Sequence, residues 1–154
     1  MTKVLGFRAD PSNARYAIVT HDGSTFALEN ANTETRLVYP ADITEAPKKV
    51  LWLYREIERI FHADPTIERV VIKTNEYGLV EKAAMRESSY IEAALMLLCE
   101  QRQIPVVIKT YASLSTRSAD VKAHAESRVG RTAKYWDNKI ADAIIAGWWG
   151  AKPS

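Results

Sequence analysis

The sequence predicts an α/β protein with one mixed β-sheet and helices on both of its faces. Three observations support this prediction. The first 40 residues contain short runs rich in apolar and β-branched residues, separated by turn signals such as HDGS at 21–24. From about residue 45 onward, helical and strand-like patterns alternate. The strand-like runs of this second part are continuously apolar, which is typical of strands covered on both faces.

The N-terminal part is expected to form an antiparallel meander. VLGF at 4–7 and ARYAIVTH at 14–21 are strand-like, and TFALEN at 25–30 follows the turn. A further β-like run, RLVYP at 36–40, ends at a proline, which has no N–H to donate to a sheet. Three antiparallel strands are the simplest account of this segment.

The second part is expected to alternate helix and strand. EAPKKVLWLYREIERIFH at 45–62 carries its apolar residues at helical spacing and predicts an amphipathic helix. The elements that follow are a strand ERVVIK at 68–73, a helix from about Glu81 to Gln103, a strand VVIKTYA at 106–112, a polar basic segment from Ser113 to Lys134, and a helix YWDNKIADAIIAGWW at 135–149. The predicted order is therefore β-β-β-α-β-α-β-α.

Size and composition predict one domain that spans residues 1–154, since 154 residues with 47% hydrophobic content can bury one ordinary core. The only cysteine, Cys99, lies in an apolar run, so neither a disulfide nor a thiol pair for zinc is expected, and a reducing cytoplasm suits the chain. No apolar run approaches the ~20 residues that span a bilayer, and we expect no membrane association. Six scattered glycines do not form a phosphate-binding loop, and His21, His62 and His124 lack metal-ligand spacing.

Charge is unevenly distributed along the chain. Residues 1–100 hold 12 Lys or Arg against 15 Asp or Glu, whereas residues 101–154 hold 9 against 4. Such a basic C-terminal third favours a polyanionic partner, DNA or RNA, although a solvated basic surface explains it equally well. The candidate nucleic-acid-binding residues are Arg117, Lys122, Arg128, Arg131 and Lys134, with Tyr111, Tyr135 and Trp136 nearby for base stacking.

Three stretches of the chain are similar to one protein family. VLGFRADPSNARYAIV at 4–19 resembles, without a gap, the opening of RuvC-type Holliday-junction resolvases, roughly I-L-G-I-D-P-G-S-x-x-x-G-Y-x-V-I. VVIK at 70–73 takes the place of the family's strand that ends in a glutamate, and IADAIIAG at 140–147 is similar to its closing helix of D-x-x-D-A-x-x-x-A type. The order of elements matches as well, because these proteins have the ribonuclease H-like arrangement.

The resemblance implies a two-metal nuclease site that this chain has altered. In the family, four carboxylates hold two divalent ions for phosphodiester hydrolysis. The first three positions fall on Arg8, Lys73 and Lys139, and only the fourth is still an acid, Asp142. Lys139 and Asp142 share a helix face at a spacing of three, whereas Asp137, five residues before Asp142, lies on another side. The chain is thus interpreted as a divergent bacterial or phage member with a degenerate active site.

Relocated ligands are the alternative to a degenerate site. Asp10 shares a strand face with Arg8, and Glu76 lies just beyond Lys73, so Asp10, Glu76 and Asp142 are the candidate catalytic residues of a displaced Mg²⁺ or Mn²⁺ site. Without relocation, no metal or other cofactor is expected, because the four family positions bring a charge of +2 instead of −4.

Two interpretations of the cationic positions remain open. In the first, Asp142 pairs with one or two of the three cations and the former metal site is a structural salt-bridge cluster. In the second, the surplus positive charge holds a phosphate of a nucleic acid that is bound and not cut.

Three functions follow from these interpretations. The leading hypothesis is a catalytically inactive RuvC-like protein that binds nucleic acid or a partner protein. The alternatives are an active Mg²⁺- or Mn²⁺-dependent nuclease or junction resolvase, and a protein-interaction module that never meets nucleic acid. A homodimer is expected by analogy with the family, and Trp148 and Trp149 are candidates for either the core or a dimer interface.

Overall fold

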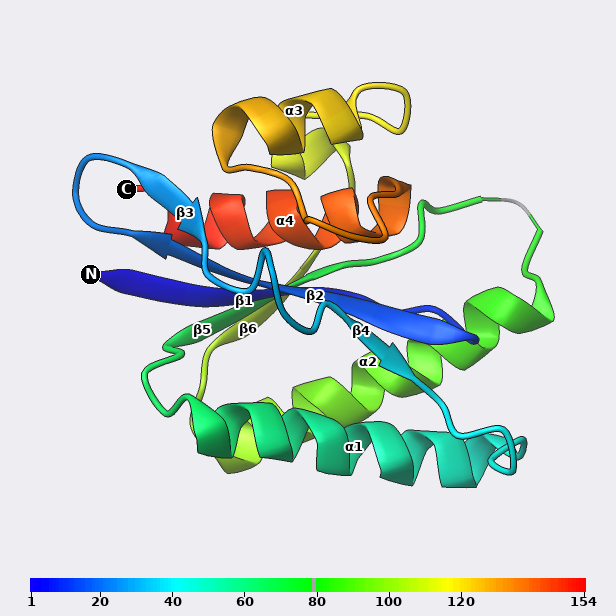
Figure 1. Ribbon diagram of the computed structural model, residues 1–154. Helices are drawn as coiled ribbons and strands as arrows, with labels where there is room; N and C mark the ends of the chain where they lie inside the picture. Colours follow the sequence, from blue (N-terminus) through cyan, green and yellow to red (C-terminus); the bar gives the residue numbers. More distant parts are fainter. Residues whose placement is uncertain (79) are drawn as a thin grey trace.

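The computed structural model describes residues 1–78 and 80–154 and has a central sheet between two helical layers (Figure 1). The strands are β1 (Thr2–Arg8), β2 (Asn13–His21), β3 (Phe26–Leu28), β4 (Arg36–Val38), β5 (Arg69–Lys73) and β6 (Val106–Lys109). The helices are α1 (Ala46–Ala63), α2 (Ala83–Gln101), α3 (Val121–Arg128) and α4 (Asn138–Ala151), with a 3₁₀ turn, η1 (Ala112–Leu114), after β6. The predicted α/β class is confirmed.

The sheet is mixed, as predicted, with the order β3-β2-β1-β5-β6. β1 pairs with β2 in antiparallel fashion and with β5 in parallel, and β5 pairs with β6 in parallel. The N-terminal part differs from the expected three strands, because two short strands, β3 and β4, pair with opposite ends of the long strand β2. The chain between them leaves the sheet at Asn30, whose side chain accepts a hydrogen bond from the Ile18 N–H (2.8 Å) and so takes the place of a sheet contact.

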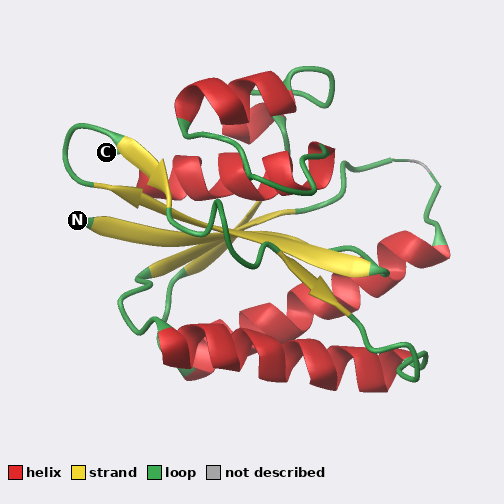
Figure 2. Cartoon of the chain, viewed as in Figure 1, coloured by secondary structure: helices red, strands yellow, loops and turns green. Residues whose placement is uncertain are grey.

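Helices α1 and α2 cover one face of the sheet, and α4 covers the other face with α3 packed outside it (Figure 2). Successive residues of β1 serve both cores, because side chains alternate between the faces of a strand. Leu5 belongs to the core cluster that includes Ile57 of α1 and Leu95 of α2, whereas Val4 belongs to the cluster that includes Ile144 and Ala151 of α4. Burial on both faces explains why β1 and β5 read as continuous apolar runs.

Element ends depart from the sequence prediction in several places. The strand expected over 106–112 ends at Lys109, and η1 begins at Ala112. The terminal helix begins at Asn138, since Asp137 caps it by accepting a hydrogen bond from the Ile140 N–H (2.9 Å), so Tyr135 and Trp136 precede the helix. The basic segment contains η1 and α3, which the sequence did not predict. α3 is short and polar, with only Val121 and Ala125 buried, so its apolar pattern is too sparse to be recognised.

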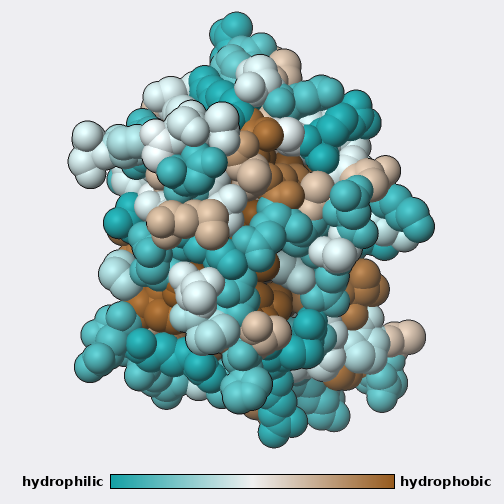
Figure 3. All heavy atoms as spheres, turned by 60° about the vertical axis from the view of Figure 1, so that its left-hand side comes forward, coloured by the Kyte–Doolittle hydropathy of each residue, from teal (hydrophilic) through white to brown (hydrophobic). Residues whose placement is uncertain are grey.

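Figure 3 shows one face of the molecule, on which hydrophobic residues lie in separate places between hydrophilic ones. Within residues 1–78 and 80–154, none of the helices has the length and the apolar character needed to cross a bilayer.

Candidate functional site

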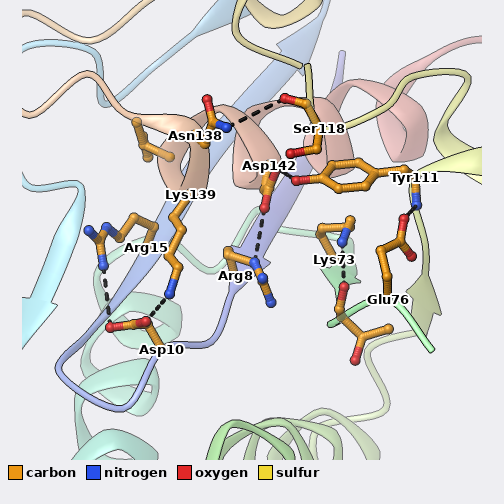
Figure 4. A network of polar contacts seen from close by, with 12 residues as sticks. Arg8, Asp10, Arg15, Lys73, Glu76, Tyr111, Ser118, Asn138, Lys139 and Asp142 are labelled. Atoms are coloured by element: carbon orange, nitrogen blue, oxygen red, sulfur yellow. Dashed lines mark hydrogen bonds and ion pairs between the residues drawn. The ribbon is translucent and has the colours of Figure 1, made fainter. Parts of the chain in front are cut away.

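The candidate site lies at one end of the central strands. Arg8 ends β1 and Lys73 ends β5, and because these strands are parallel, both side chains emerge at the same edge of the sheet. Asp142 faces them from the second turn of α4, and Tyr111 approaches from the segment after β6 (Figure 4). The carboxyl ends of parallel strands are where α/β sheets usually place their sites.

Direct packing of helix backbone on strand backbone holds the site together. A Cβ added at Gly6 of β1 would lie 2.6 Å from the backbone nitrogen of Gly147 and would clash with the carbonyl oxygen of Ala143. Only glycine at position 6 therefore lets α4 rest on β1. This close approach fixes Asp142 relative to Arg8.

Arg8 and Asp142 form a buried ion pair. The Arg8 Nε donates to Asp142 Oδ2 at 2.9 Å, and the Tyr111 hydroxyl donates to Asp142 Oδ1 at 2.8 Å. Asp142 is 1% exposed and Arg8 is 9% exposed. Burial raises the pKa of Asp142, and the hydrogen bonds and charges of Tyr111, Arg8 and Lys73 oppose that rise only in part. The arrangement matches the first interpretation of the sequence, in which Asp142 pairs with a neighbouring cation.

Lys73 is fully buried beside this pair. Its ammonium lies 3.8 Å from the centre of the Tyr111 ring and donates a hydrogen bond to the carbonyl of Thr74. Burial lowers the pKa of Lys73, and the neighbouring Arg8 lowers it further, whereas the carboxylates around it act in the opposite direction. Tyr111, which the sequence suggested for base stacking, is thus turned inward against a cation and a carboxylate.

The structure adds a carboxylate that the sequence reasoning missed. Glu92 of α2 is 5% exposed, and its Oε1 accepts a hydrogen bond from the Thr74 hydroxyl at 3.0 Å. Burial raises the pKa of Glu92, although the charges of Arg8 and Lys73 lower it. A signal was present, because Glu92 falls among the apolar positions of the α2 stripe, between Ser88 and Leu95.

Two atoms of this cluster lack hydrogen-bond partners among the described residues. They are Arg8 Nη1 and Glu92 Oε2, both of which are buried. A buried polar atom without a hydrogen-bond partner costs free energy, so the cluster is not optimised for stability alone.

The remaining cation, Lys139, is paired elsewhere. Its ammonium binds Asp10 Oδ1, while Asp10 Oδ2 accepts hydrogen bonds from the backbone N–H groups of Ser12 (3.0 Å) and Asn13 (3.2 Å). Although burial raises the pKa of Asp10, the hydrogen bonds from Lys139, Ser12 and Asn13 hold it well below its ordinary value. Arg15 lies between Asp10 and Asp137, 3.7 Å and 2.9 Å from their carboxylates.

The charge count made from the sequence needs a correction. That count gave a surplus of +2 but covered only the four family positions. The fold brings further charged groups to them, namely Arg15, Asp10, Glu76, Glu92 and Asp137. Positive groups therefore do not outnumber negative ones, and surplus charge at this place gives no support for a bound phosphate.

The three ligands of the alternative metal site are not brought together. Asp10 is held by Lys139, Asp142 by Arg8, and Glu76 accepts a hydrogen bond from the backbone N–H of Tyr111 at 3.0 Å. In the part of the chain that the structure describes, no three His, Cys, Asp or Glu side chains form a group that could hold a metal ion. Because hard divalent ions need several oxygen ligands and repel cations, the residues present do not fit a two-metal centre.

The predicted nucleic-acid-binding residues surround α3, but they do not all offer free charge. Arg117 is bound to Asp120, and Arg131 lies 3.7 Å from Glu126. Arg128 stacks on Trp148 at 4.4 Å from the ring centre and donates to the carbonyl of Ser115 at 2.9 Å. Arg128 therefore has a packing role.

The other two predicted residues, Lys122 and Lys134, are exposed. They have no ion pair among the described residues. Trp148 and Trp149, whose place the sequence left open, are both partly buried, and Trp149 packs against the core of α4. Cations cover both rings, since Arg128 lies 4.4 Å from the centre of the Trp148 ring and Lys109 lies 4.4 Å from that of Trp149.

Solved structures with the same fold are Holliday-junction resolvases. A Thermus thermophilus RuvC in complex with Holliday junction substrate has a TM-score of 0.76 and 13% identity, over 96% of this chain and 91% of that chain. A second Thermus thermophilus RuvC structure has the same TM-score at 11% identity, over 96% and 92%. The yeast mitochondrial Holliday junction resolvase Ydc2 has a TM-score of 0.64 at 13% identity, over 97% and 78%. These likenesses confirm the predicted RuvC-like, ribonuclease H-like fold, while no protein-family model and no curated protein matches the sequence.

Proposed function

We propose that the chain is a RuvC-like protein that has lost two-metal nuclease chemistry and binds nucleic acid in the cytoplasm. The observation that carries this proposal is the buried ion pair between Arg8 and Asp142, with Lys73 beside it. Arg8 and Lys73 stand at positions that hold carboxylates in RuvC-type proteins, and both lie beside Asp142, the one acid left at the four family positions. A divalent ion placed among these groups would meet positive charge on two sides.

Nucleic acid is the proposed partner because of the fold and of the basic third of the chain. A structural neighbour has been solved with a Holliday junction. In this chain, Lys122 and Lys134 are exposed on the side of α3 and α4. Phosphate contacts by such lysines are sequence-independent and weaken as salt rises.

Calorimetric titration with Mn²⁺ tests the lost chemistry. The expected result is no specific binding by the wild type or by Asp142→Asn, together with no cleavage of a four-way DNA junction. Specific Mn²⁺ binding that disappears in Asp142→Asn would restore the nuclease and refute the proposal.

Binding of DNA and RNA, measured at several salt concentrations, tests the second half of the proposal. The slope of log affinity against log salt is expected to fall when Lys122 or Lys134 is replaced by glutamine, by about one per lost phosphate contact. Affinity that is absent at low salt would favour a module that binds only proteins.

We also propose a homodimer, because one surface of the protein suits contact with a second copy of the chain. An apolar groove of about 560 Å³ runs between α1 and α2, where Leu51 (48% exposed), Tyr90 (44%) and Leu97 (56%) reach solvent. α1 and α2 run in the same direction, as the contacts Lys49–Glu87 near their starts and Glu58–Arg102 near their ends require. A copy related by a two-fold axis perpendicular to the two helices would place the positive N-terminal ends of both helices on the negative C-terminal ends of its partner. This face is the proposed homodimer interface.

A further inference from the structure

A small pocket lies between two loops that the sequence reasoning did not connect. Its volume is about 280 Å³, and it is lined by Asn32, Thr33 and Thr35 on one side and by Lys134 and Tyr135 on the other. The Ala133 N–H donates to the carbonyl of Ala31 at 2.9 Å and ties the two loops together. Pockets for drug-sized ligands occupy roughly 300–1,000 Å³, so this one suits a single small ring system.

Tyr135 is presented at the mouth of this pocket in an unusual conformation. Its side chain is 57% exposed and its backbone φ is +60°, a left-handed conformation that bulky residues rarely adopt. The conformation is held in place locally, because the Thr132 hydroxyl donates to the carbonyl of Lys134 at 2.7 Å and Asp137 caps α4. An exposed aromatic ring kept in a strained backbone position is more common at functional sites than elsewhere.

The charge around the ring is positive. The guanidinium of Arg36 lies 3.5 Å from the centre of the Tyr135 ring, and Lys134 is exposed next to it. The neighbouring acids are already paired, since Glu34 binds Arg59 at 2.8 Å and Asp137 binds Arg15 at 2.9 Å. The cations Arg36 and Lys134 are thus the groups available to an anionic ligand.

The pocket and the candidate site are linked by one chain of ion pairs. Asp137 follows Tyr135 by two residues and binds Arg15, which lies between Asp137 and Asp10, and Asp10 in turn binds Lys139. These contacts connect the start of α4 to the turn after β1, where the candidate site begins (Figure 4).

We propose that this pocket binds one unpaired nucleobase of a nucleic-acid strand. The part of the Tyr135 ring that Arg36 leaves open stacks on the base, and Arg36 and Lys134 neutralise the adjacent phosphates. The amide of Asn32 and the hydroxyls of Thr33 and Thr35 supply donors and acceptors for the edge of the base. This inference rests on the proposed function and narrows it, because it predicts a preference for single-stranded or junction substrates over an intact duplex.

The test compares a single-stranded oligonucleotide that carries 2-aminopurine with a blunt duplex of the same sequence. Two variants are needed. Tyr135→Asn removes the ring but keeps a residue that tolerates positive φ, so folding is preserved, and Tyr135→Phe keeps the ring as the matched control. Melting curves check that both variants fold.

The expected result is selective. Base stacking on an aromatic ring contributes about 1–3 kcal/mol, so Tyr135→Asn should weaken single-strand binding about 5- to 150-fold. Its affinity for the duplex should stay within about twofold of the wild type, and Tyr135→Phe should bind both probes like the wild type. The 2-aminopurine fluorescence, quenched on binding to the wild type, should stay unquenched with Tyr135→Asn.

Failures of the two proposals are distinguishable. Wild-type protein that binds neither probe at low salt would overturn the proposed function and this inference with it. Wild-type binding that Tyr135→Asn leaves unchanged, or reduces equally for strand and duplex, would overturn the base pocket alone and leave nucleic-acid binding in place.

Discussion

Replacement of Asp142 by asparagine tests whether the buried ion pair stabilises the fold. The substitution keeps the shape of the side chain but removes the charge that faces Arg8, 2.9 Å away, while the guanidinium remains only 9% exposed. Removing one partner of a buried pair outright costs about 3–5 kcal/mol. The amide keeps one oxygen that can accept from Arg8 or from Tyr111, but its NH2 group faces the other of these two donors. Because burial raises the pKa of Asp142, removal of the charge itself recovers part of this cost, so the expected loss is smaller, about 1–3 kcal/mol.

Urea denaturation followed by tryptophan fluorescence measures this loss in the free energy of unfolding. A thermal melt gives a second readout: in a protein of this size, 1 kcal/mol corresponds to about 2–4 °C in melting temperature, so a fall of about 2–12 °C is expected. Asp42→Asn is the matched control, because Asp42 is exposed and the same chemical change there should stay within about 0.5 kcal/mol. Asp142→Asn with the same stability as this control would refute the stabilising role of the pair.

Three further predictions concern other parts of the molecule. Glu92→Gln should raise the free energy of unfolding at pH 7 by about 1 kcal/mol, since the wild type keeps a buried carboxylate oxygen without a partner. The pKa of Glu92 is raised in the folded state. Protonated Glu92 therefore contributes to the free energy of unfolding below the unfolded pKa of 4.5, and this contribution is lost as pH rises through the folded pKa. Chemical denaturation from pH 4 to pH 8 should therefore show that the stability gain of Glu92→Gln over the wild type grows with pH. A difference between the two proteins that stays constant with pH would contradict the prediction. Gly6→Ala should cost at least about 3 kcal/mol or abolish folding, because its Cβ would overlap the α4 backbone, and a near-wild-type melting curve would mean that α4 lies farther from β1. Leu97→Glu should convert the proposed dimer to a monomer in light-scattering measurements with little change in melting temperature, whereas Val107→Glu on the edge strand β6 should leave the dimer intact.

The sequence predicted the arrangement of the sheet better than the environment of the site. Alternating runs and turn signals are local features, so β1, β2, α1 and α4 could be located from them. The partner of each charged side chain depends on contacts between distant elements. Lys139, for example, lies three residues before Asp142 on α4, yet it binds Asp10 from the turn after β1.

Glu92 was missed although its place in the apolar stripe of α2 was a signal, and Tyr135 was expected only as one of three aromatic residues for base stacking. The positive φ of Tyr135 distinguishes it from the other two, and no residue pattern predicts that conformation. The short strand β4 was noticed as a β-like run, but its pairing with β2 depends on the path of residues 29–35.

The glycine contact between β1 and α4 also bears on how a protein of this kind can change its chemistry. Backbone atoms set the separation of the two elements, so the side chains at positions 8 and 142 can be exchanged without moving the atoms that carry them. Acids at both places and the ion pair of the present chain fit the same backbone frame. The geometry of such a fold and the chemistry of its side chains can therefore vary separately.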